Sequence, residues 1–154
     1  MADLRVTLPA DDISWTVDLF ESEAPELCGA IREALPLETE LVHGKFSGEE
    51  VYAPTDREAF RDLPKENLTY DVAAGDVGYW DSHRDDGAVV RDRAGFGELV
   101  FIYGRQARPR MGADHPVAID LIGRVRGNVD AFEAAAARRQ HDGSTTVRVG
   151  QLDG

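Results

Sequence analysis

The sequence predicts a mostly β protein in which about eight or nine short strands and two helices form a closed or nearly closed barrel. Three observations lead to this fold class. Apolar and polar residues alternate with period two over most of the chain, two stretches have helical periodicity, and Pro or Gly separates the segments. The 154 residues fall within the usual size of one domain, so we expect a single domain over residues 1–154.

The chain begins with a predicted β-hairpin. Leu4, Val6 and Leu8 alternate with polar neighbours, and the same alternation covers residues 13–19 after a break at Pro9. Period-two patterning on both sides of a short turn is typical of two paired strands.

Residues 22–35 are predicted to form an amphipathic helix. Leu27, Ile31 and Leu35 fall on one stripe of this helix, and Ser22 is its expected N-cap. From residue 38 the strand pattern returns.

Residues 38–46 and 49–54 predict a second hairpin, with Ser47-Gly48 as its turn. Residues 55–66 are polar and predict a connection with one helical turn.

The second half of the chain continues as strands and ends with a helix and a last strand. Strand patterns cover residues 68–72, 76–80, 88–90, 98–103, 115–127 and 145–150. The continuous apolar run at 98–103 indicates a strand that is buried on both faces. A helix is predicted over residues 130–143, where Asp130 and Glu133 have the spacing of a capping box and Gly143 ends the helix.

The charge balance is strongly acidic. Asp and Glu number 29 against 17 Lys and Arg, a net charge of −12, and Lys45 and Lys65 are the only lysines. This composition favours a protein kept in solution at high salt, because salt screens the self-repulsion of a high net charge. The alternative is a GC-rich genome, which accounts for the arginine excess but does not require the acidity. The negative field repels phosphate backbones, so no nucleic-acid partner is expected.

Other features indicate a cytoplasmic protein. No run approaches the roughly 18 continuous apolar residues of a membrane span, and no secretory signal is visible. We therefore expect no membrane partner. Cys28 is the only cysteine, which excludes an internal disulfide, and its surroundings indicate a buried apolar thiol.

Three clusters are candidates for chemistry. One comprises residues 66–69, Gly75-Asp76 and Tyr79-Trp80, which offer amide, carboxylate and aromatic surfaces to a small ligand, or else serve turns and core. His43, Lys45 and Ser47 fall on one face of a strand that runs into a tight turn, which suits an acid/base or anion-binding edge, or else a solvent-facing strand edge. Glu98 and Arg105 belong to another cluster, with further arginines after it, which suits a carboxylate or phosphate, or else forms salt bridges to nearby acids. No known metal-ligand spacing is present, so neither a metal nor a cofactor is expected.

Three blocks of the chain, HGKFSGEEVYAP, ENLTYDVAAGDVGYW and GELVFIYG, resemble consecutive blocks of a prokaryotic cyclophilin-like family of unknown function, of the DUF3830 type. The resemblance covers roughly residues 40 to 105. It departs from the family at Phe46, where a Trp is frequent, and over residues 115–125. The resemblance implies a small closed barrel of about eight strands. It also selects positions that match the family blocks: His43, Lys45, Ser47, Gly48, Glu49, Asn67, Gly75, Asp76, Glu98, Tyr103 and Gly104.

These observations lead to one main hypothesis of function and two alternatives. The main one is a protein that binds or processes a small polar metabolite, with or without a carboxylate group, in a barrel pocket. The expected ligand-binding residues are His43, Lys45, Ser47, Glu49, Asn67, Tyr103 and Arg105. The residues do not decide whether the protein is an enzyme; in an enzyme, His43 or Glu98 is the candidate acid or base. The alternatives are a peptidyl-prolyl isomerase and a non-catalytic interaction module, which includes a homodimer.

Overall fold

Eight antiparallel strands close into a barrel, as the sequence predicts. The computed structural model describes residues 3–81, 96–112 and 115–152. The barrel strands are β1 (Leu4–Leu8), β2 (Ile13–Leu19), β3 (Leu37–His43), β4 (Glu50–Asp56), β6 (Asp76–Asp81), β7 (Phe96–Ile102), β8 (Ile119–Gly127) and β9 (Thr145–Gln151). The other elements are β5 (Leu68–Thr69), α1 (Pro25–Ala34), α2 (Val129–Asp142) and two short 3-10 turns.

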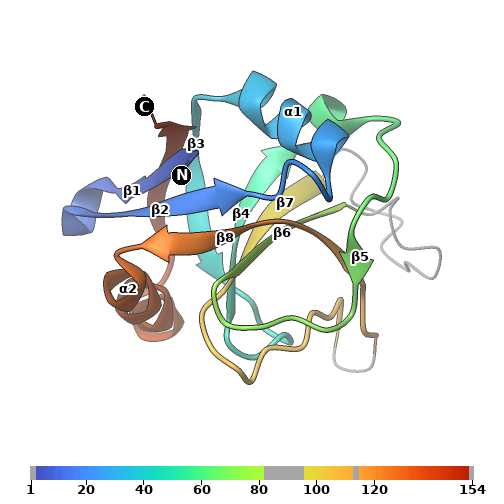
Figure 1. Ribbon diagram of the computed structural model, residues 1–154. Coiled ribbons are helices and arrows are strands. Elements are labelled where there is room, and N and C mark those ends of the chain that lie inside the picture. Colours follow the sequence, from blue (N-terminus) through green and yellow to red (C-terminus); the bar gives the residue numbers. More distant parts are fainter. Residues whose placement is uncertain (1–2, 82–95, 113–114, 153–154) are drawn as a thin grey trace.

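The pairing of β2 with β8 closes the barrel. The strands follow the order β2-β1-β9-β3-β4-β7-β6-β8, and every neighbouring pair is antiparallel. The short β5 adds to β8 as an extra strand. Closure removes the unpaired edges that an open sheet would present. The ring of strands is visible in Figure 1.

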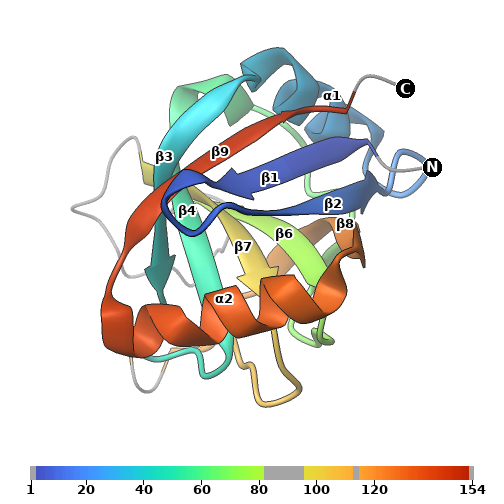
Figure 2. The same cartoon turned by 90° about the vertical axis from the view of Figure 1, so that its left-hand side faces the viewer.

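The two helices cover opposite ends of the barrel (Figures 1 and 2). Helix α1 buries Leu27, Cys28 and Ile31, and burial raises the pKa of the Cys28 thiol to about 12. Cys28 is therefore a buried, unreactive thiol, as the sequence indicates. Helix α2 buries Phe132 against the aromatic residues of the barrel.

Side chains fill the interior of the barrel. Trp15 of β2 and Phe101 of β7 come from strands that are not neighbours, yet their ring centroids are 6.1 Å apart. Phe132 contacts both, at centroid distances of 5.0 and 6.3 Å. The barrel core is therefore packed, and the cavities described below lie outside it.

A second apolar cluster covers the outer face of β6 and β7. Trp80, Val100 and Ile102 pack there against Ala107 and other residues. Because side chains alternate along a strand, Tyr79 points into the barrel core while Trp80 belongs to this outer cluster. Strand β7 is therefore buried on both faces, as its apolar run predicts.

Both predicted helix N-caps are wrong. Helix α1 begins at Pro25 with Ala24 as N-cap, and α2 begins at Val129 with Asn128 as N-cap. The carboxylate of Glu66 caps α1 instead, since it accepts the backbone N–H groups of residues 26 and 27 at 3.0 and 2.7 Å. Gly143 ends α2 as predicted.

Three predicted strands are shorter than expected. The strand predicted over residues 38–46 ends at His43 as β3, so Lys45 and Ser47 lie in the loop before β4 and not on one strand face with His43, which corrects that expectation. Residues 70–72 leave the strand pattern, because the Thr69 hydroxyl bonds the backbone of Asp71 in a local turn. Strand β8 begins at Ile119 rather than at residue 115. The predicted strand at 88–90 lies outside the described residues.

The tight turn between β3 and β4 depends on Gly48. Its φ is +73°, and a Cβ there would clash with the carbonyl oxygen of Gln106. We expect Gly48→Ala to destabilise the protein by at least about 1–2 kcal/mol, because a left-handed backbone and a steric clash are combined. Urea unfolding measures this change.

Gly29→Ala is the matched control. Gly29 lies in α1, and a Cβ added to it would meet no atom within 4 Å. The control is expected to stabilise the protein by about 0.5–1 kcal/mol. Destabilisation of equal size in both variants would contradict a special role for Gly48.

Candidate functional site

A cavity of about 200 Å³ lies on the outer face of β4 and β7, next to the β3–β4 turn; we name it the Glu50 cavity. Glu50 and Tyr52 point outward here because Val51 and Ala53, which alternate with them, point into the barrel. The lining residues are Gly44, Lys45, Phe46, Ser47, Glu50, Tyr52, Glu98, Arg110, Met111 and Gly112. The cavity thus combines two carboxyl groups, two cationic side chains and apolar walls.

Glu50 is a buried acid of this cavity with a shifted pKa. It is only 4% exposed, and burial raises the pKa of its carboxyl from 4.5 to about 7, while the nearby Ser47 side chain opposes the shift. Gly44 permits the close approach of the carboxyl, since a Cβ at that position would lie 2.9 Å from Oε2 of Glu50. Near neutral pH the group therefore exists in both its protonated and its ionised form.

Ser47 joins the turn to the segment that follows β7. Its Oγ accepts the backbone N–H of Arg110 at 3.0 Å and donates to the carbonyl of Arg110 at 3.3 Å. Its own carbonyl accepts the N–H of Arg108 at 2.8 Å. These bonds hold Arg110 over the cavity, and they explain why Ser47 itself is buried.

His43 and Tyr103 form a hydrogen-bonded pair on the other side of Gly44. Nδ1 of His43 lies 2.7 Å from the carbonyl of Gly44, and Nε2 lies 2.7 Å from the Tyr103 hydroxyl. A carbonyl only accepts, so Nδ1 donates, and in the neutral ring Nε2 accepts from Tyr103. Burial and the nearby Glu49 raise the pKa of Tyr103, which keeps its hydroxyl protonated.

A second cavity, of about 400 Å³, lies between the end of β3 and the last turn of α2; we name it the Arg139 cavity. Figure 2 shows these two elements side by side. Its lining residues are Val42, His43, Gly44, Lys45, Arg139, Gln140, Gly143 and Ser144. Gly44 and Lys45 line both cavities and separate one from the other.

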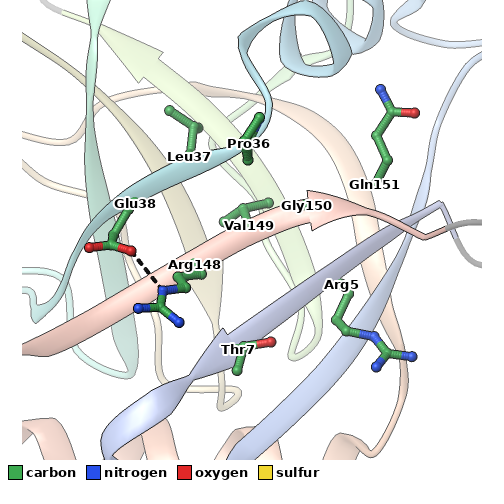
Figure 3. Close-up of a pocket in the computed structure, with 9 residues that line it drawn as sticks. All are labelled: Arg5, Thr7, Pro36, Leu37, Glu38, Arg148, Val149, Gly150 and Gln151. Atoms are coloured by element: carbon green, nitrogen blue, oxygen red, sulfur yellow. Dashed lines mark hydrogen bonds and ion pairs between the residues drawn. The ribbon is translucent and has the colours of Figure 1, made fainter.

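A third cavity, of about 350 Å³, lies on the outer face of β1, β9 and β3 (Figure 3). Arg148 and Glu38 form an ion pair across it at 2.6 Å, with both side chains 60% exposed. Arg5 points from β1 along its rim. The ion pair is open to solvent, and none of the residues selected from the sequence lines this cavity.

The structure distributes the residues selected from the sequence over several places. Lys45, Ser47 and Glu98 line the Glu50 cavity, and His43 lines the Arg139 cavity with Lys45. Tyr103 contacts His43. These residues therefore surround the β3–β4 turn.

The other three selected residues have different surroundings. Asn67 bonds the backbone of β8 through its side chain, and its N–H donates to the carboxylate of Asp120 at 3.0 Å. Glu49 accepts the N–H of Gln106 at 3.0 Å. Arg105 is exposed and lines neither cavity.

Sequence reasoning did not select Glu50, Tyr52 or Arg139. The strand alternation carried a signal for the first two, because it places both on the face opposite Val51. No local pattern distinguishes Glu50 from Glu49 as the buried acid. Arg139 lies in the last turn of α2, and no motif in the sequence selects it.

Two absences concern the described part of the chain alone. Among residues 3–81, 96–112 and 115–152, no three His, Cys, Asp or Glu side chains gather as metal ligands would. The helices in those ranges are all too short or too polar to span a membrane.

Solved structures share this fold at low sequence identity. One is McbB in complex with tryptophan, with a TM-score of 0.70 at 17% identity; the match covers 98% of this chain and 45% of that chain. Another is the solution structure of the hypothetical protein AF2241 from Archaeoglobus fulgidus, with a TM-score of 0.59 at 22% identity, covering 98% and 95%. The chain thus spans under half the length of the McbB chain. At these identities the likeness concerns the fold alone.

Sequence comparison adds one match. A search of curated proteins finds no significant match to the chain. A family model described as "Protein of unknown function (DUF3830)" matches residues 6–151. The matched region extends from β1 to β9 and includes every residue that lines the Glu50 and Arg139 cavities.

Proposed function

The chain belongs to the DUF3830 family of proteins of unknown function, and we propose that this member binds a small carboxylate-bearing metabolite in the Glu50 cavity. The observation that carries the proposal is the meeting of a buried carboxyl with two cationic side chains. Glu50, with its pKa near 7, lines the same cavity as Lys45 and Arg110.

The cationic pair supports a carboxylate as the recognised group. Arg110 offers a planar guanidinium that suits a carboxylate, and Lys45 adds a flexible positive charge. The two cations match the two carboxyl groups of the cavity in number, whereas acids outnumber bases by 29 to 17 in the chain as a whole. Phe46 and Met111 provide apolar surface for the rest of the ligand.

The volume supports a small ligand. About 200 Å³ is below the roughly 300–1,000 Å³ of pockets for drug-sized molecules. A metabolite with few non-hydrogen atoms fits this space better than a nucleotide.

Glu50 is the best-placed group for proton transfer to such a ligand. A carboxyl with a pKa near 7 can donate or accept a proton at neutral pH. Both ring nitrogens of His43 are already bonded, so His43 would have to break a hydrogen bond to act as a base. Glu98 lines the same cavity and remains a second candidate. Binding alone, without catalysis, requires only the cationic pair.

A related fold provides a precedent for a ligand of this class. McbB was solved in complex with tryptophan, which carries a carboxylate. The precedent is compatible with the proposal, and the argument from Glu50, Lys45 and Arg110 stands without it.

Thermal unfolding with a ligand panel tests the proposal. The panel pairs acetate, lactate and succinate with their neutral amides at constant ionic strength. A carboxylate at ten times its Kd is expected to raise the Tm of the wild type by about 3–6 °C, and its amide by less than about 1 °C. Arg110→Gln should abolish the shift.

Arg105→Gln is the matched control, since it removes the same charge from an exposed position outside the cavity. It should keep the shift of the wild type. Equal shifts with acids and amides, or equal loss in both variants, would exclude the proposal.

A second candidate, prolyl isomerisation, has one observation in its favour. An arginine, Arg110, stands beside the apolar Met111 and Phe46 in the same cavity. The carboxyl groups of Glu50 and Glu98 make the cavity a poor site for an apolar proline ring. A proline-peptide isomerisation assay separates the two candidates: acceleration that Arg110→Gln removes would favour the isomerase.

A further inference from the structure

The Arg139 cavity is a cationic space in an acidic protein. It lies between the end of β3 and the last turn of α2, and none of the eight residues that line it is Asp or Glu. The chain as a whole carries a net charge of −12. This cavity is lined by Arg139 and Lys45 and by no acid, so its charge is opposite in sign to the net charge of the chain.

Arg139 is buried and has unused donors. The residue is 6% exposed, its Nε donates to the carbonyl of Ala135 at 3.2 Å, and its Nη2 lies 3.4 Å from Oδ2 of Asp11. A guanidinium carries five N–H donors. Those two contacts are the ones that the described residues provide, which leaves donors available to a ligand in the cavity.

The counter-charge of Arg139 is incomplete. Asp11 also contacts Arg138, at 3.3 Å, so one carboxylate faces two guanidinium groups. The carbonyls at the end of α2 add a partial negative charge, and these two arginines offset it. Lys45 then adds a full positive charge on the opposite wall.

Neutral donors complete the lining. Ser144 contributes a hydroxyl and Gln140 an amide, while Gly143 has no side chain to occupy the cavity. His43 also lines the cavity, and Gly44 and Tyr103 occupy both of its ring nitrogens. The donors thus come from two sides, α2 with its following residues and the β3–β4 turn.

We propose that the Arg139 cavity binds a phosphate group, either free phosphate or the phosphate of a small metabolite. Four kinds of donor (guanidinium, ammonium, hydroxyl and amide) suit the several oxygens of a phosphate better than the two oxygens of a carboxylate. The volume of about 400 Å³ leaves space for a small group attached to the phosphate. This inference does not rest on the function proposed for the Glu50 cavity, since Arg139 lines only the second cavity.

Calorimetric titration with inorganic phosphate at constant ionic strength tests the proposal. The wild type is expected to bind phosphate saturably. Arg139→Gln should weaken binding about 10- to 100-fold, the loss expected for charge-assisted hydrogen bonds. Arg138→Gln is the matched control, because it removes the same charge from the same turn outside the cavity, and it should change the Kd less than about twofold. Similar losses in both variants would show a general charge effect and overturn the proposal.

Two further arms complete the experiment. Glycerol 3-phosphate, titrated in parallel, distinguishes a phosphorylated metabolite from free phosphate as the preferred source, and either result supports the site. Succinate binding more tightly than both phosphates would overturn it. Lys45→Ala, at an exposed position, is the second variant if Arg139→Gln does not fold; an unchanged phosphate Kd in Lys45→Ala would then count against the site.

Discussion

Replacing Phe132 by alanine is expected to destabilise the protein by about 3–5 kcal/mol, the usual cost of truncating a fully buried phenylalanine. Phe132 contacts the rings of Trp15 and Phe101 in the barrel core and joins α2 to the strands. Its loss leaves a cavity that packed aromatic rings cannot fill. Urea unfolding followed by tryptophan fluorescence measures the change.

Phe46→Ala is the control for this measurement. Phe46 is 51% exposed, so the same truncation should change the free energy of unfolding by less than about 1 kcal/mol. Equal effects of the two variants would show that α2 does not depend on its aromatic anchor.

The second large effect concerns the pH dependence that Glu50 imposes. Its pKa is 4.5 in the unfolded reference and about 7 in the folded protein. Between these two values the folded state binds more protons than the unfolded state, so the free energy of unfolding falls as the pH rises. The stability present below pH 4.5 is lost as the pH passes the folded pKa, and the total loss is roughly 3 kcal/mol.

Glu50→Gln separates this titration from those of the other acids. The amide cannot ionise, so the variant should gain roughly 3 kcal/mol relative to the wild type between about pH 4.5 and about pH 8. Urea unfolding of both proteins at these two pH values measures the difference. A difference that stays the same at both values would mean that Glu50 titrates normally.

Much of the fold follows from local patterns. The alternation at residues 4–8 and 13–19 predicts β1 and β2 because a strand alternates its side chains between two faces. Residues 98–103 predict a strand buried on both faces, and β7 is one. The helix ends were harder, because Glu66 caps α1 from a distant segment.

The candidate site follows from local patterns only in part. Lys45, Ser47 and Glu98 were selected from the sequence, and they line one cavity. Glu49 and Glu50 are adjacent acids, and the buried one, Glu50, was not selected from the sequence. Both acids of the pair lie in the same short segment of sequence, and only the packing of the segment after β7 buries one of them.

The sequence by itself therefore determined the order and type of most elements, since backbone periodicity and turn residues act over a few positions. It also determined the barrel class and the acidic charge. The tertiary structure alone decided where the cavities lie. Closing the ring of strands placed Trp15, Phe101 and Phe132 in the interior, and the three cavities described above lie outside this packed core. It also brought Arg139 beside β3, although about 100 residues separate them, because long-range packing and not local pattern sets such contacts.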